Sequence, residues 1–108
     1  MLTKILNNFK SINIRFFTRP GCSLCQSAKE IIYPAVEEDF PTNRFTIEEI
    51  DIDKENNKQY FDKFKNDVPV GMIDQKIIFK HRIDEDKLYY DLETILRQQI
   101  KKEKEEKE

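Results

Sequence analysis

The chain has no tryptophan, two glycines, two cysteines and one histidine. Two thiols cannot complete a tetrahedral zinc site by themselves, and the single histidine, His81, is far from both cysteines in sequence. No segment approaches the roughly 20 consecutive apolar residues of a membrane-spanning helix, and the opening MLTKILNNFK lacks the continuous apolar core of a secretory signal. The sequence therefore disfavours a zinc site within one chain and a membrane protein, and it predicts a cytoplasmic location.

Acidic residues are absent from Met1 through Lys29, although the same stretch carries several lysines and arginines. The neighbourhood of the cysteines is therefore predicted to be electropositive. This basic N-terminus leaves an organelle-targeting segment as a weaker alternative to a short leading helix or a frayed end. Over the whole chain, 19 basic and 21 acidic residues leave a net charge of -2, which gives no reason to expect nucleic acid or an anionic membrane as a partner.

A chain of 108 residues has room for one domain with one hydrophobic core. Hydrophobic residues make up 38% of it, which is enough for a compact core, and the 37% of charged residues imply a heavily solvated exterior. We expect a lead segment over residues 1–11, a folded domain over residues 12–100 and a charged, solvated tail over residues 101–108.

The first half of the chain predicts two strands joined by a helix. INIRFFT, Ile12 to Thr18, has strand composition and ends at the breaker RPG. A helix is expected from about Ser23, with a kink or restart at Pro34, because proline lacks a backbone donor. RFTIEEIDID, Arg44 to Asp53, predicts a second strand, with a change of apolar phase before Ile50 that indicates a bulge.

The second half predicts a short helix, a hairpin and a last helix. Asp53 is expected to cap the short helix, and Asp84 to cap the last one. The short helix has an apolar inner face of Tyr60, Phe61 and Phe64. The last helix has an apolar stripe of Leu88, Leu92, Ile95, Leu96 and Ile100. VPVGMI and KIIFK, separated by DQ, have the spacing of an antiparallel hairpin. With a right-handed crossover, this order predicts an α/β fold with a central mixed four-stranded sheet flanked by helices.

The two cysteines, Cys22 and Cys25, have the spacing of a redox dithiol. If Cys22 lies in the turn before the helix and Cys25 one turn inside it, the sulfurs come within bonding reach. The helix N-terminus would stabilise a thiolate on Cys22, and Arg19 and Lys29 are expected to add to this effect. Cys22 would then attack a substrate disulfide, and Cys25 would resolve the mixed disulfide.

Other interpretations of the pair stay open. Two subunits could supply four thiols to zinc or to an iron–sulfur cluster. The two cysteines could also be inert residues that fall together by chance. A non-catalytic binding module, which engages a protein through the hairpin edge or through the basic loop around His81, is a further alternative.

Taken together, TRPGCSLC, the later VPV and the order of strands and helices resemble the thioredoxin superfamily, and specifically a small glutaredoxin-like protein. The resemblance covers roughly Asn13 to Gln99. It implies a thioredoxin fold of order βαβαββα and glutaredoxin-like thiol–disulfide oxidoreductase activity. It also implies that Cys22 is the nucleophile and Cys25 the resolving cysteine.

The same resemblance implies three substrate-binding residues. Pro69 matches the family's cis-proline, which would leave the backbone of Val68 unpaired and able to hold an extended substrate. Arg19 matches the basic residue that glutaredoxins place near the glutathione carboxylate. Phe16 replaces the buried acid that thioredoxins carry on the strand before the motif.

A glutaredoxin-like loop after the hairpin would contain a Gly-Gly pair followed by Asp, but this chain reads KHRID, Lys80 to Asp84. Asp84 would keep the acidic contact to glutathione. Arg82 and its basic neighbours would hold an anionic group of the substrate, although a solvated loop is the plainer interpretation.

The resemblance further implies a set of partners. No tightly bound cofactor and no metal are expected, and glutathione is a candidate co-substrate. The expected substrate is a disulfide-containing protein or glutathione, with a reductase or glutathione as electron donor. The protein is expected to act as a monomer, without nucleic acid or membrane.

Overall fold

The computed structural model describes residues 10–107. Its elements are β1 (Ile12–Thr18), α2 (Ser23–Glu38), β2 (Phe45–Asp51), a 3-10 turn (Glu55–Asn57), α3 (Lys58–Phe64), β3 (Val70–Ile73), β4 (Lys76–Lys80) and α4 (Glu85–Lys107). The strand order is β2-β1-β3-β4, with β1 and β2 parallel and the other two pairs antiparallel. The predicted mixed four-stranded sheet is confirmed. Of the expected lead segment, only Lys10 and Ser11 lie within the described residues.

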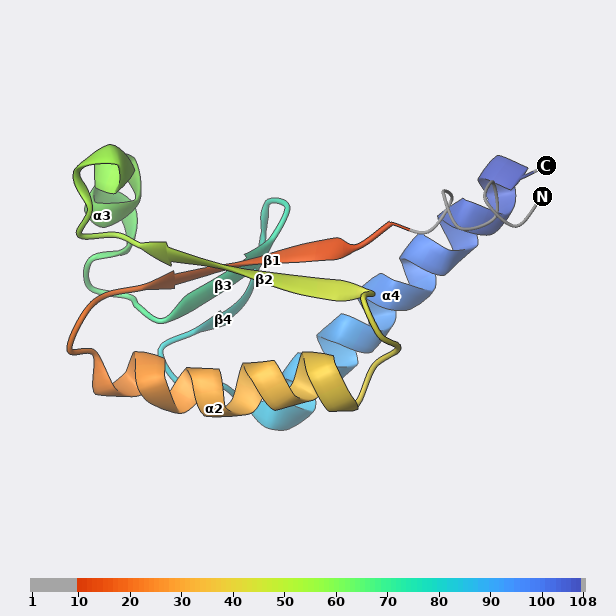
Figure 1. Cartoon of the computed structure of the whole chain (residues 1–108), viewed down its shortest axis with the longest axis horizontal. Helices are drawn as coiled ribbons and strands as arrows, with labels where there is room; N and C mark the ends of the chain where they lie inside the picture. The colour runs from red at the N-terminus through yellow and green to blue at the C-terminus, as the bar shows by residue number, and fades with distance from the viewer. Residues whose placement is uncertain (1–9, 108) are drawn as a thin grey trace.

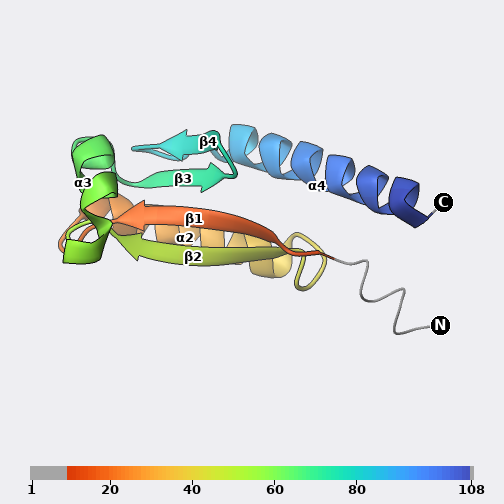
Figure 2. The ribbon, with the colours of Figure 1, turned by 90° about the horizontal axis from the view of Figure 1, so that it is seen from above.

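The sheet separates two apolar clusters. Helices α2 and α4 cover one face, and α3 covers one end of the opposite face (Figures 1 and 2). Successive side chains of a strand point to opposite faces, so β1 contributes to both clusters. Ile14 and Phe16 pack beneath α2 and α4, whereas Phe17 packs beneath α3 against Phe64.

The apolar residues of β2 also change from one face of the sheet to the other, and this change is not caused by a bulge. Pairing between β1 and β2 runs without interruption from Ile12 opposite Phe45 to Thr18 opposite Asp51. Phe45 belongs to the cluster under α2 and α4, whereas Ile50 belongs to the cluster under α3. The expected bulge is therefore wrong: the strand buries one face at its start and the other face at its end.

Two expectations about helix boundaries are also wrong. Helix α2 continues through Pro34 to Glu38, so the expected restart there is wrong, whereas the alternative of a kink stays a prediction. Asp53 does not cap a helix, because Lys54 stands at the N-cap of the 3-10 turn and Asn57 at that of α3. Proline lacks one backbone donor, and the apolar face of α2 buried against the sheet outweighs that loss.

The hairpin of β3 and β4 forms as predicted, with a register shift between Gly71 and Met72. Asp74, the first residue of the two-residue loop, has a positive φ of 53°. Gly71 lies opposite Phe79, and a Cβ added at Gly71 would come within 2.2 Å of the Phe79 ring. Only glycine leaves room for this ring, which makes an edge contact with Phe16 at 5.8 Å between centroids.

The last helix begins and packs as predicted. Asp84 caps α4, since its Oδ1 accepts the N–H of Lys87 at 3.3 Å. The apolar stripe of α4 packs on the larger cluster. The tail, however, is not uniformly solvated: α4 extends to Lys107, and Glu103 is buried against Arg44.

Candidate functional site

The two cysteines lie where β1 ends and α2 begins. The strand stops at Thr18, and the turn that follows contains Gly21, whose φ of 73° lies in the left-handed region that glycine adopts without strain. Helix α2 then starts at Ser23. The segment RPG therefore reverses the chain, and this reversal places Cys22 at the N-terminus of the helix.

Cys22 is the N-cap residue of α2. Its Sγ accepts the backbone N–H of Cys25 at 3.1 Å, and its carbonyl accepts the N–H of Gln26 at 3.1 Å. The two cysteines form a disulfide with a Cα–Cα distance of 5.2 Å, within the ordinary range. Cys22 is partly exposed, whereas Cys25 is 2% exposed. The predicted placement is confirmed: Cys22 precedes the helix and is partly exposed, and Cys25 lies one turn inside it and is buried.

The proline that begins the hairpin lies beside this loop. The Val68–Pro69 peptide bond is cis, as the resemblance implied. Val70 pairs with Phe17 near the end of β1, which brings Pro69 to the edge of the sheet where the cysteine loop starts. The N–H of Val68 donates to the carbonyl of Phe64 at 3.2 Å. The expectation that the backbone of Val68 is unpaired is therefore wrong for its N–H, because α3 ends directly beneath it.

Arg19 is held by three groups. Its Nη2 and Nε contact the two carboxylate oxygens of Asp53 at 3.0 and 3.3 Å, and its Nη1 donates to the carbonyl of Lys65 at 3.2 Å. Its guanidinium also lies over the ring of Phe61, 5.2 Å from the centroid. Arg19 therefore ties the cysteine loop to α3 and to the loop after β2.

Lys29, one turn beyond Cys25, has a carboxylate partner as well. Its Nζ lies 3.0 Å from Glu49 on β2, and Glu49 also accepts a hydrogen bond from Tyr33 of α2. This hydrogen bond lowers the pKa of Glu49, and burial together with the bond raises the pKa of Tyr33 to about 12. Glu49 therefore stays ionised at neutral pH and holds Lys29.

These pairings set the charge of the dithiol site. A cavity of about 490 Å³ is lined by both cysteines and by the flanking loop. Of the described residues that line it, Arg19 and Lys29 are the basic ones, and both are paired with carboxylates that lie outside the lining. The cavity is thus close to neutral, and the helix N-terminus is the main group that favours a thiolate on Cys22.

The basic loop after the hairpin is partly engaged. Lys80 and His81 both approach Asp67, at 3.9 and 3.6 Å. His81 also donates its N–H to the carbonyl of Pro69 at 2.8 Å. Arg82 is exposed and has no ion-pair partner among the described side chains of residues 10–105, whereas Asp84 is used as the cap of α4. Both predicted binding residues of this loop are exposed, but only Arg82 has no ion pair and no capping role among the described residues.

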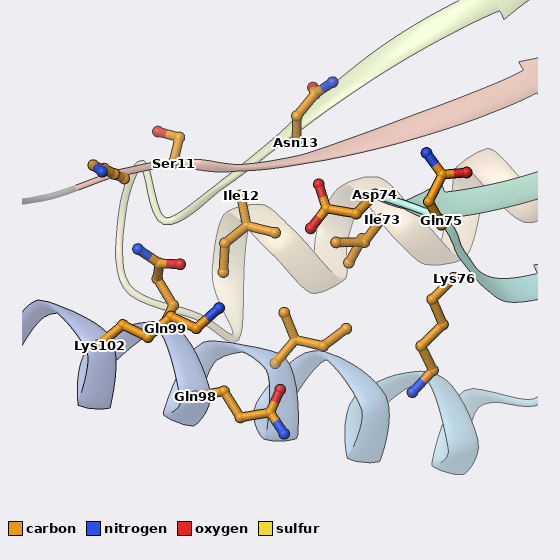
Figure 3. Close-up of a pocket in the computed structure, with 12 residues that line it drawn as sticks. Ser11, Ile12, Asn13, Ile73, Asp74, Gln75, Lys76, Gln98, Gln99 and Lys102 are labelled. Carbon is orange, nitrogen blue, oxygen red and sulfur yellow. The ribbon is translucent and has the colours of Figure 1, made fainter.

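A second cavity lies elsewhere. It has a volume of about 680 Å³ and is bounded by the start of β1, the β3–β4 turn and α4. Figure 3 shows Ile12 and Ile73 pointing into it, with Gln98, Gln99 and Lys102 along the helix. Neither cysteine nor the histidine lines it. This cavity is therefore separate from the dithiol site.

Among the side chains that the structure describes, those of residues 10–105, no three of His, Cys, Asp or Glu are grouped so that they could hold a metal ion. None of the helices in the described part of the chain is long and apolar enough to cross a membrane.

The fold and the site together define a class of protein. A mixed sheet of order β2-β1-β3-β4, a Cys-x-x-Cys pair at the start of the helix after β1 and a cis-proline before β3 constitute a thioredoxin-like fold with its dithiol. The chain belongs to the glutaredoxin-like domain (DUF836) family, whose model matches residues 13–93.

A comparison with solved structures agrees on the fold. One structure, described as that of a malarial protein, has 13% sequence identity to this chain and a TM-score of 0.55. The match covers 79% of this chain and 97% of that chain. At this level of identity the likeness concerns the fold alone.

Two residues of the site were missed from the sequence, and both lie on or just after β2. Parallel neighbouring strands end at the same edge of a sheet, and Thr18 pairs with Asp51. Residues shortly after β1 and β2, such as Arg19 and Asp53, must therefore lie close together. Glu49 is four residues after Phe45 in β2, so the two side chains lie on the same face of the sheet, the one that α2 covers. The expected bulge between them would have placed Glu49 on the opposite face.

Proposed function

We propose that this protein is a glutaredoxin-like thiol–disulfide oxidoreductase, with Cys22 as the nucleophile and Cys25 as the resolving thiol. The observation that supports this most is the position of Cys22 Sγ at the N-cap of α2, where it accepts the N–H of Cys25 at 3.1 Å. In the reduced protein the same N–H and the helix dipole favour the thiolate of Cys22. The thiolate is the nucleophilic form of cysteine.

The reaction consists of two exchanges. The Cys22 thiolate attacks one sulfur of a substrate disulfide; the substrate S–S bond breaks, a mixed disulfide forms and one substrate thiolate leaves. Cys25, as its thiolate, then attacks the Cys22 sulfur; the mixed disulfide breaks, the Cys22–Cys25 disulfide forms and the second substrate thiolate leaves. Two electrons pass from the dithiol to the substrate. A low-molecular-weight thiol such as glutathione, or a dithiol reductase, must return them.

The proton of Cys25 needs an acceptor in the second exchange. The strand β1 carries no acidic residue, and Phe16 on this strand is fully buried. We therefore assign the proton to the substrate thiolate released in the first exchange, or to water that enters the cavity. Pro69, whose side chain is buried, would shape the edge of the sheet beside the cysteine loop, and the exposed Arg82 would contact the substrate outside the cavity that contains the cysteines.

Trapping of the mixed disulfide tests this proposal. Reduced Cys25→Ser protein is treated with a neutral disulfide, bis(2-hydroxyethyl) disulfide, and its mass is measured. We expect a stable adduct of one half-disulfide on Cys22 and none on Cys22→Ser. The wild type should instead return to the intramolecular disulfide. An equal yield of adduct on both variants, or none on either, would overturn the assignment.

A second readout addresses the alternatives left open by the sequence. Anaerobically purified protein is assayed for bound iron and visible absorbance, and its oligomeric state is measured. Iron bound by a dimer, and lost in Cys22→Ser, would replace the oxidoreductase with a cluster-binding protein. Absence of disulfide exchange together with retained partner binding in Cys22→Ser would favour the binding module.

A further inference from the structure

We propose that Asp53 determines the substrate specificity of the dithiol site, because its carboxylate occupies the guanidinium of Arg19 and so disfavours substrates that present a carboxylate there. This inference rests on the proposed function. The selected substrates are disulfides that are neutral next to the reacting sulfur, as in a protein segment. The disfavoured class is that of small carboxylated disulfides, of which oxidised glutathione is the available probe.

The edge of the Arg19 guanidinium that would bind a substrate carboxylate is already occupied. Arg has five N–H donors, and the edge formed by Nε and Nη2 matches the two oxygens of a carboxylate. In this protein that edge is filled by Asp53, with Nη2–Oδ1 at 3.0 Å and Nε–Oδ2 at 3.3 Å. A substrate carboxylate could bind the same edge only by displacing Asp53.

Arg19 lies where a substrate of the dithiol would meet it. Arg19 lines the same cavity as Cys22 and Cys25, whereas Asp53 approaches from outside the lining. The second basic residue of the cavity, Lys29, is likewise paired, with Glu49 at 3.0 Å. An anionic substrate that enters the cavity therefore meets no basic side chain without a carboxylate partner among the described residues that line it.

The remaining contacts of Arg19 make the proposal testable. The carbonyl of Lys65 accepts from Nη1 at 3.2 Å, and the ring of Phe61 lies 5.2 Å from the guanidinium. Neither contact depends on Asp53, so Arg19 stays in place when this carboxylate is neutralised. The Nε and Nη2 edge would then be open to a ligand.

The backbone N–H of Val68 also disfavours small carboxylated peptides as substrates. A peptide-like ligand that lies against the cis-proline would need the N–H of Val68, and that group already donates to Phe64 at 3.2 Å. Two donors that a small carboxylated peptide would use are therefore satisfied within the protein. A protein disulfide can instead draw its binding energy from contacts outside the cavity.

The experiment compares two small disulfides in single turnovers. The reduced protein is mixed with oxidised glutathione or with bis(2-hydroxyethyl) disulfide, samples are quenched with acid, and the loss of protein thiols is followed by mass. The quantity reported is the ratio of the two second-order rate constants. Asp53→Asn should raise this ratio about three- to tenfold, as expected when a charge-assisted pair worth about 1 kcal/mol becomes available to the ligand.

Asp62→Asn is the matched control. Asp62 is an exposed residue of α3, and its substitution makes the same change in net charge without touching Arg19. It should leave the ratio within about twofold of the wild-type value, because exposed charges act weakly at a distance in salt. Arg19→Gln combined with Asp53→Asn should abolish the gain of the single Asp53→Asn variant.

Each result has one meaning. An unchanged ratio in Asp53→Asn, or an equal rise in Asp62→Asn, overturns the role of Asp53 while reaction with the neutral disulfide still supports the oxidoreductase. Failure of the wild type to react with either disulfide overturns the proposed function itself. Circular dichroism spectra and thermal midpoints of all variants establish that they are folded. If Asp53→Asn is unfolded, Asp53→Ser takes its place.

Discussion

Arg44 and Glu103 form a buried, bidentate ion pair that joins the start of β2 to the end of α4. The guanidinium Nη1 and Nη2 lie 2.6 and 2.9 Å from the two carboxylate oxygens, and the side chains are 11% and 10% exposed. Gln99 and the N–H of Lys10 also approach the carboxylate, at 3.3 and 3.4 Å. These groups anchor a helix that extends beyond the sheet (Figure 1).

The ion pair makes stability depend on pH. The bond to Arg44 lowers the pKa of Glu103 from 4.5 to about 2. Because the folded pKa lies below the unfolded one, the stabilisation is complete above about pH 4.5 and is lost as the pH falls towards about 2. We expect Glu103→Gln to lose about 3 kcal/mol of unfolding free energy at pH 7. The difference from wild type, measured by urea unfolding, should shrink over this pH window.

Glu105→Gln serves as the control for that measurement. Glu105 lies in the same helix but is exposed. Its substitution should change stability by no more than about 0.5 kcal/mol at any pH. Equal losses in the two variants would show that the tail carries a general charge effect and not a specific pair.

Pro34 limits the stability of α2. The helix continues through it, but proline cannot donate to the carbonyl four residues earlier, and its side chain is exposed. Pro34→Ala should restore the hydrogen bond and raise the free energy of unfolding by about 2 to 2.6 kcal/mol. This gain is the helix preference of about 3 kcal/mol less the entropy that proline removes from the unfolded chain. Ser27→Ala, also exposed in α2, should have a much smaller effect. A less stable Pro34→Ala protein would contradict the prediction.

Gly71 is required by the ring of Phe79. A Cβ at this position would lie 2.2 to 2.8 Å from three ring atoms. Gly71→Ala should therefore cost about 1 to 3 kcal/mol, as overpacked cores do. The cost should fall when Phe79 is also changed to Leu, and unfolding of the four proteins in a double-mutant cycle measures the coupling. Additive effects would show that the two residues do not compete for the same space.

The two thiols of the reduced protein should differ in reactivity. Cys22 is partly exposed at the helix N-terminus, whereas Cys25 is 2% exposed. Iodoacetamide should therefore modify Cys22 at least about tenfold faster than Cys25. In Cys25→Ser the rate should reach half its maximum below the pH of about 8.5 that is typical of free cysteine. Rates measured by mass against pH test both statements, and preferential labelling of Cys25 would exchange the assigned roles.

The sequence by itself determined the order of strands and helices, the apolar stripe of α4, the cap at Asp84 and the position of the dithiol. These features depend on local periodicity and on local chain reversal, which are written in neighbouring residues. The family resemblance further implied the cis bond before Pro69, which the structure contains.

Only the tertiary structure decided how the charges are paired. Arg19 and Asp53 are separated by a whole strand and helix, and they meet because β1 and β2 are parallel neighbours. Glu103 reads as part of a solvated tail, yet it is buried because α4 carries it to Arg44. Val68 loses its free N–H because α3 ends beneath it. An ion pair or a backbone bond between distant segments depends on packing, and local sequence patterns carry no record of it.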